Sequence, residues 1–292
     1  MRVARALFGD RVEPAIQHEG HWVRAGVLAA GKDRDVLELL GRRAELLSQL
    51  ADADLSTLVS AGDAVPDEQV DLRQPLLGPR AIVAVGLNYR DHVAEVSWEA
   101  PPTPLLFAKW PSSLTGPYDR VALDASISSQ VDYEVELAAV IGQPTLDVPV
   151  DRALGQVAGY TIANDLSARD IQTSESQWTR AKSFDGFCPI GPWVTTADEV
   201  PDPQRLQLSS FVNGKRRQHA STAQMIHGVA ELVAFASRAT TLMPGDLILT
   251  GTPSGVALGA SDPQWLKPGD VVRIEIETLG HLENQLVDRG AR

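Results

Sequence analysis

Cysteine is almost absent from this sequence, since Cys188 is the one cysteine among 292 residues. No disulfide can therefore form within the chain, which suits a reducing compartment. Cys188 lies in the segment FCPIG, between apolar neighbours, and no basic residue stands beside it to lower its thiol pKa. We expect this cysteine to be buried and inert rather than a nucleophile.

Positive charge and long apolar runs are also scarce. The net charge is -12, and such an acidic surface should repel phosphate backbones and anionic lipids. The N-terminus MRVARALFGD has no signal-peptide core, and no stretch reaches the roughly 20 apolar residues of a membrane span. We expect no nucleic-acid partner, no membrane partner and a cytoplasmic location.

Hydrophobic residues are plentiful at 43%, enough for one large domain or for one with a small companion. The polar, proline-containing segment AGDAVPDEQVDLRQPLLGP has the composition of a linker. We therefore predict a small N-terminal α/β domain over residues 1–75 and a larger domain over residues 76–292.

Periodicity predicts an α+β fold that is rich in strands. The segment DVLELLGRRAELLSQL has helical spacing, with Asp35 and Glu38 as a capping-box pattern at its start. Beyond residue 80, five short apolar runs predict strands, namely AIVAVGL, VDYEVELAAVIG, GYTIAND, LILTGT and VVRIEIETL. One long helix is expected among them, opening at Ser221 and Gln224 and burying a stripe of Met225, Val229, Leu232, Val233 and Ala236.

The strand VDYEVELAAV concentrates negative charge. A period of two places Asp132, Glu134 and Glu136 on one face, where they would repel one another in a pocket unless protons or a cation neutralise them. Glu134 and Glu136 could coordinate a hard divalent ion such as Mg²⁺. Asp165, which follows the apolar run GYTIAN, could supply a third carboxylate. The alternative is a solvated strand face, which is the commoner origin of an E-x-E pattern.

Three further segments offer chemistry. In VGLNYRDHVAE, His92 and Glu95 would share one face of a helix, where the carboxylate could orient the imidazole as a general base. Lys182 in AKSFDGFCPIGP and Thr252 in the glycine-rich LTGTPSGV lie where the backbone can approach a ligand. A surface ion pair and ordinary turn chemistry are the alternatives.

The joint occurrence and order of six motifs is more specific than any one of them. The motifs are VGLNYRDHVAE, DYEVELAAVIG, NDLSARDIQ, AKSFDGFCPIGPW, LTGTPSGVA and PGDVVRIEIETLGHLEN. This set resembles the fumarylacetoacetate hydrolase family over about residues 80–288. The resemblance implies a mixed β-sandwich roll as the catalytic domain, with magnesium, or else manganese or calcium, held by Glu134, Glu136 and Asp165.

The resemblance also implies roles for the remaining candidates. His92 and Glu95 would form a catalytic dyad on a mobile lid, while Lys182 would act on the substrate with them. Gln172 would contact the substrate and Thr252 would hold its carboxylate. A homodimer is implied as well, with a small keto acid as the substrate.

One departure narrows the resemblance to a branch. The founding members carry a further metal-binding aspartate upstream of the histidine, whereas AIVAVGLN contains no acid. The chain is therefore similar to the branch with three protein ligands, which includes acylpyruvate hydrolases, oxaloacetate decarboxylases and hydroxymuconate-type isomerases and decarboxylases. Asp132 is not a usual ligand there, so we expect it to support the ligands.

The function expected first is metal-dependent hydrolysis of a carbon–carbon bond in acylpyruvate-like diketo acids. In that reaction His92 and Glu95 would activate water, and the metal would stabilise an enolate. The alternative is an isomerase or decarboxylase of a 2-oxo or 2-hydroxydienoate intermediate of aromatic catabolism. A non-catalytic homologue is a third reading, which the intact His92, Glu95 and Lys182 disfavour.

Overall fold

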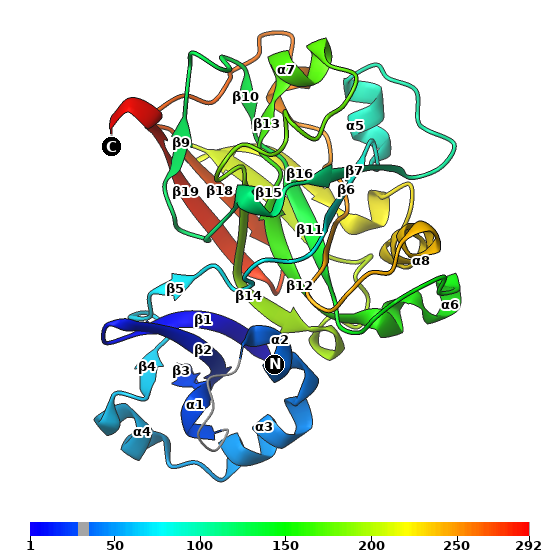
Figure 1. Cartoon of the computed structure of the whole chain (residues 1–292). Helices are drawn as coiled ribbons and strands as arrows, with labels where there is room; N and C mark the ends of the chain where they lie inside the picture. The colour runs from blue at the N-terminus through cyan, green and yellow to red at the C-terminus, as the bar shows by residue number, and fades with distance from the viewer. Residues whose placement is uncertain (29–34, 292) are drawn as a thin grey trace.

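A large mixed sheet runs through the computed structural model, which describes residues 1–28 and 35–291 (Figure 1). Its strands pair in the order β4-β3-β2-β1-β14-β12-β11-β17-β6-β7, with β5 beside β1 and β8 beside β14. Their bounds are β1 Arg2–Phe8, β2 Arg11–His18, β3 His21–Arg24, β4 Ala64–Pro66, β5 Leu72–Arg73, β6 Ile82–Gly86, β7 Leu105–Lys109, β8 Leu114–Thr115, β11 Val135–Ile141, β12 Val157–Asn164, β14 Cys188–Thr196 and β17 Leu247–Leu249.

A smaller sheet in the order β16-β15-β18-β19-β9 and the pair β10-β13 complete the strands described. Their bounds are β9 Val121–Leu123, β10 Val131–Asp132, β13 Ser167–Ala168, β15 Gln207–Val212, β16 Lys215–Ser221, β18 Val271–Ile276 and β19 Gly280–Asp288. With the helices below, this arrangement confirms the expected strand-rich α+β fold.

The helices are short. They are α1 Ala25–Leu28, α2 Val36–Gly41, α3 Arg43–Ala51, α4 Leu55–Ala61, α5 Arg90–Glu95, α6 Val150–Ala153, α7 Arg169–Ser174 and α8 Val229–Ala239, with 3₁₀ turns η1 Pro111–Ser113, η2 Leu154–Gln156, η3 Ala197–Glu199, η4 Thr222–Gln224, η5 Ala257–Gly259 and η6 Arg289–Ala291. None of the helices in the described ranges has the length and apolarity to cross a bilayer.

Strand β11 is buried on both faces, and its alternation separates two cores. Val135, Leu137 and Ala139 pack in the core that includes the smaller sheet and α8. Ala138 and Val140 point the other way, into a core shared with the N-terminal elements. The period of two is therefore confirmed, and the acidic residues at the start of this strand are held in the interior rather than in solvent.

The N-terminal elements, at the bottom of Figure 1, join the large sheet, because β1 pairs antiparallel with β14. The division into domains at residues 1–75 and 76–292 stays a prediction. Cys188 on β14 is fully buried, and burial raises the pKa of its thiol to about 12, which agrees with the inert role expected.

Three expected elements have different boundaries in the structure. The first amphipathic helix is capped by Asp35 as predicted, but it breaks at Arg42 into α2 and α3. The Ser221 capping box forms on the turn η4, so the long helix starts later, at Val229. The expected strand over residues 131–142 is interrupted between β10 and β11, because a two-strand pair with β13 replaces the main sheet there.

Candidate metal centre and active site

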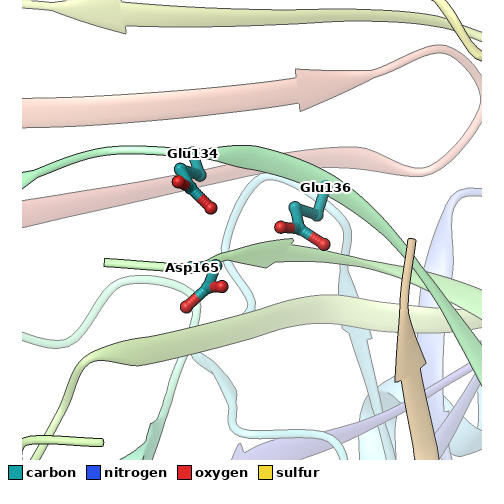
Figure 2. A group of neighbouring side chains, drawn as sticks. All are labelled: Glu134, Glu136 and Asp165. Atoms are coloured by element: carbon teal, nitrogen blue, oxygen red, sulfur yellow. The ribbon is translucent and has the colours of Figure 1, made fainter. Parts of the chain in front are cut away.

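Three buried carboxylates converge where β11 begins and β12 ends. Figure 2 shows the side chains of Glu134, Glu136 and Asp165 gathered in one place, and one oxygen of each lies within 4.8 Å of the others. Antiparallel pairing sets this meeting, because Val135 lies opposite Asn164 and the Asp165 N–H donates to the Glu134 carbonyl at 3.0 Å. The sequence prediction that these three side chains come together is therefore borne out by the geometry.

Cationic side chains contact two of the three carboxylates. Lys182 Nζ lies 2.7 Å from Glu134 Oε2 and 3.0 Å from Asp165 Oδ2. Lys109 Nζ lies 2.6 Å from Asp165 Oδ1 and also donates to the carbonyls of Lys182 and Phe187. These contacts fix the Asp165 carboxylate from both sides.

Glu136 has a different environment. Its Oε2 accepts the Gly251 N–H at 2.7 Å, and no described lysine, arginine or histidine forms an ion pair with it. Burial, followed by the charges of Asp165 and Glu134, raises the pKa of Glu136 well above its usual range. Burial opposes ionisation of Glu134 as well, but Lys182 and Arg169 outweigh it and hold that pKa at about 2.

This donor set fits a hard divalent cation. Carboxylate oxygens are the ligands that Mg²⁺ and Mn²⁺ prefer, and Glu136 is the carboxylate of the trio that no described side-chain cation pairs with directly. Glu134, Glu136 and Asp165 are the residues that would hold such an ion. The Gly251 N–H would keep the Glu136 carboxylate oriented.

Asp132 is linked to the trio through one other side chain. Its carboxylate accepts Arg169 Nε at 2.9 Å and the N–H groups of Ala257 and Leu258 at 2.8 and 3.0 Å. Arg169 Nη2 in turn donates to Glu134 Oε1 at 2.6 Å. Asp132 thus acts on the trio through the guanidinium of Arg169, in line with the supporting role expected for it.

The segment that carries His92 and Glu95 is helical, as expected, and forms α5. His92 Nδ1 lies 3.3 Å from Glu95 Oε2, and the Gly255 N–H donates to Glu95 Oε1 at 2.8 Å. With Nδ1 facing the carboxylate, Nε2 is the nitrogen available to a substrate or water. The assignment of these residues as a dyad stays a prediction, which this contact supports.

One pocket collects these groups. His92, Glu134, Gln172, Lys182 and Thr252 line one pocket. The pocket therefore brings His92 of the dyad together with Glu134 of the carboxylate trio.

The two polar residues expected to touch the substrate already have protein partners. Gln172 Oε1 accepts Arg169 Nη1 at 2.8 Å, which leaves its amide nitrogen as the group available to a ligand. Thr252 Oγ1 donates to the Val135 carbonyl at 3.0 Å and accepts Gln218 Nε2 at 2.8 Å. Its role as the carboxylate anchor stays a prediction, and the structure gives its hydroxyl a scaffold function.

The position of Glu95 depends on Gly259. A Cβ at residue 259 would lie 2.1 Å from Glu95 Cγ, so Gly259→Ala must displace the Glu95 side chain from His92. We expect turnover to fall about tenfold or more while metal affinity is unchanged, because about 1 Å of misplacement can cost catalysis heavily. Steady-state kinetics and calorimetric metal titration measure the two effects. Gly41→Ala, which meets open space, is the control, and equal behaviour of both variants would contradict the expectation.

Sequence reasoning missed two residues of the site. Arg169 lies within the motif NDLSARDIQ, of which only the acidic residues and Gln172 suggest a role in the site. Its guanidinium donates hydrogen bonds to Asp132, Glu134 and Gln172. Lys109 is 1% exposed at the end of β7. The available signal was a lysine at the end of the apolar segment LLFAK. If that segment is a buried strand, its lysine needs an acidic partner, because buried lysine is rare unless it is paired.

Comparisons with known proteins point to one family. The family model described as "Fumarylacetoacetate (FAA) hydrolase C-terminal" matches residues 81–287. The mitochondrial oxaloacetate tautomerase Fahd2a of Rattus norvegicus is 43% identical over 224 residues, which cover 76% of this chain and 71% of that protein.

Two solved structures share the fold over 99% of both chains. The 2-hydroxyhepta-2,4-diene-1,7-dioate isomerase of Mycobacterium marinum is 36% identical with a TM-score of 0.76. The maleylpyruvate hydrolase of Sphingobium sp. SYK-6, in complex with manganese(II) ion and pyruvate, is 29% identical with a TM-score of 0.78. With the family match over most of the chain, these likenesses establish that the protein belongs to the fumarylacetoacetate hydrolase family.

Proposed function

We propose that this protein is a divalent-metal-dependent hydrolase that cleaves a carbon–carbon bond in acylpyruvate-like diketo acids. The observation that carries the proposal is the pocket in which Glu134, one of the three clustered carboxylates, lies beside His92 and Lys182. The manganese and pyruvate held by the related maleylpyruvate hydrolase support a metal and a 2-oxo acid at such a site.

A bound divalent ion would supply Lewis acidity to the 2-oxo acid end of the substrate. The protein would supply the proton transfer. His92, oriented by Glu95, would take a proton from water through Nε2, and that water would attack the distal carbonyl carbon of the acyl group. The bond between that carbon and the adjacent methylene then breaks, which releases a carboxylic acid and the enolate of pyruvate.

Lys182 would stabilise the charge that develops on the departing enolate. It is buried, and although burial opposes its charge, Asp165 and Glu134 raise the pKa of its ammonium, so it stays cationic. The proton that His92 took from water would then pass to the enolate carbon, which gives pyruvate and restores the neutral imidazole. The sum is one acylpyruvate and one water converted to one carboxylic acid and one pyruvate.

A second candidate is tautomerisation, isomerisation or decarboxylation of a related 2-oxo acid. It is favoured by the names of the similar proteins, an oxaloacetate tautomerase and a hydroxydienedioate isomerase. All these reactions pass through an enol or enolate, which the same groups could stabilise. One experiment separates them: the Mn²⁺-loaded protein is given acetylpyruvate, oxaloacetate and a 2-hydroxydienedioate, while pyruvate, carbon dioxide and enol absorbance are followed separately. Absence of acetylpyruvate cleavage would reject the hydrolase proposal.

We also propose that the protein is a homodimer. Trp110 and Ile127 are 51% and 42% exposed and line one surface hollow with Phe184, an arrangement that suits contact with a second copy. Light scattering at micromolar concentration should give about twice the chain mass of 31.4 kDa. Trp110→Lys should shift the mass toward the monomer, whereas Leu146→Lys, at another exposed position, should not. A monomeric mass for the unmodified protein would refute the dimer.

A further inference from the structure

The pocket of His92 and Lys182 has a second part that is apolar. Trp98 and Trp178 pack at an interplanar angle of 36° with their ring centroids 5.7 Å apart, and Phe107 meets Trp178 edge-on at 5.5 Å. We call Trp98, Phe107 and Trp178 the aromatic wall. Lys182 Nζ lies 5.4 Å from the centroid of the Phe107 ring, so the wall begins next to the charged part of the pocket.

The aromatic wall is built into the sheet. Phe107 lies on β7, opposite Ala84 of β6. Gly86, at the end of β6, leaves room for the indole, because a Cβ there would lie 2.4 Å from Cζ3 of Trp178. Phe107 and Trp178 therefore hold a fixed place relative to the carboxylate trio, as a subsite for part of a substrate requires, and Trp98 packs on Trp178.

The cations of this pocket are already engaged. Arg169 is 2% exposed, and its Nε, Nη1 and Nη2 donate to Asp132, Gln172 and Glu134. Lys182 holds Glu134 and Asp165. Apart from His92, these two are the basic residues among the described residues that line the pocket. A second carboxylate against the aromatic wall would therefore lose its water without meeting a free lysine or arginine.

We propose that the aromatic wall binds the distal group of the substrate and selects an uncharged, apolar acyl group over one that ends in a carboxylate. The inference rests on the proposed hydrolase function and adds the substrate class. Aromatic faces offer a large apolar contact area to an alkyl or aryl group. A buried carboxylate without a partner opposes binding and the transition state alike.

Two substrates of equal length test this selection. Butanoylpyruvate and succinylpyruvate differ in that a terminal methyl is replaced by a carboxylate. With the Mn²⁺-loaded protein we expect kcat/KM for butanoylpyruvate to be higher by at least about 100-fold. Equal values, or a preference for succinylpyruvate, would overturn the proposal.

Two variants at one position test the wall itself. Trp98 is 37% exposed, so its replacement leaves the core intact. Trp98→Lys adds a cation to the wall and should reduce the preference for butanoylpyruvate by about tenfold or more relative to Trp98→Met, which is uncharged and similar in length. Because each ratio compares two substrates in one variant, a general loss of activity cancels. The same ratio in both variants would show that the distal group does not meet Trp98.

Measuring the binding of the two compounds tests the aromatic wall independently of turnover. If neither compound is cleaved, the hydrolase function is wrong, and quenching of tryptophan fluorescence on titration with each compound then decides the selection. Tighter binding of butanoylpyruvate by about 10-fold or more would support the aromatic wall as an apolar subsite. Equal binding of the two compounds would reject it.

Discussion

Replacing Glu136 with glutamine is expected to weaken Mn²⁺ binding by more than about 100-fold, because loss of a supporting partner alone costs 10- to 100-fold and this change removes a charged donor. Glu136 is the member of the trio that forms no ion pair with a described lysine, arginine or histidine, and burial raises its pKa well above the usual range. Calorimetric titration with Mn²⁺ measures the affinity and the stoichiometry. Unchanged affinity would mean that the metal ligands lie elsewhere.

Thermal unfolding of the metal-free proteins separates loss of a ligand from loss of the fold. Burial and the neighbouring Asp165 and Glu134 charges make ionised Glu136 unfavourable, so Glu136→Gln should melt at or above the metal-free wild type. In the presence of Mn²⁺ the order should reverse, because binding stabilises only the wild type. Glu283→Ala, at an exposed position on β19, serves as the control and should match the wild type in both conditions.

His92→Ala is expected to lower acylpyruvate cleavage by about 10² to 10⁴ while metal affinity is preserved, because the variant loses the general base and keeps the trio. Oxaloacetate decarboxylation, if the protein catalyses it, should fall less, since that reaction needs no activated water. Steady-state kinetics on both substrates give the two ratios. Cleavage at the wild-type rate in the variant would remove His92 from the mechanism.

Two further variants sharpen this result. Glu95→Gln keeps a hydrogen-bonding group beside His92 but removes its charge, so we expect a smaller loss than in His92→Ala. His219→Ala lies on the exposed face of β16, where the ring contacts Ser209, and should retain full activity. A loss in His219→Ala as large as that in His92→Ala would point to damage of the fold rather than of the chemistry.

The sequence predicted the parts of the site that depend on the periodicity of one helix or strand, or on the pairing of adjacent strands. Alternation along VDYEVELAAV placed Glu134 and Glu136 on one side, and the end of a neighbouring apolar run placed Asp165. The three-residue spacing of His92 and Glu95 gave the helical pair. Each of these inferences needed one element or two adjacent strands.

The parts that it missed depend on contacts between distant segments. Lys109 meets Asp165 across 56 positions of the chain, and Arg169 meets Asp132 across 37, so no local pattern could reveal either pair. The helix boundaries failed for another reason. The Ser221 capping box does form, but the chain continues only as a 3₁₀ turn before Gly228 caps the true helix.

The pairing of β1 with β14 has a consequence for shortened forms of the protein. Val3 lies opposite Val194, and Val3, Ile16 and Leu39 share a core with Ile190 of β14. A chain cut back to the family-matched region would expose apolar side chains and unpaired backbone N–H and C=O groups along this part of β14. Such a surface is a template for strand addition between molecules. We therefore expect the N-terminal segment, by covering the edge of β14, to protect the catalytic part of the protein from aggregation.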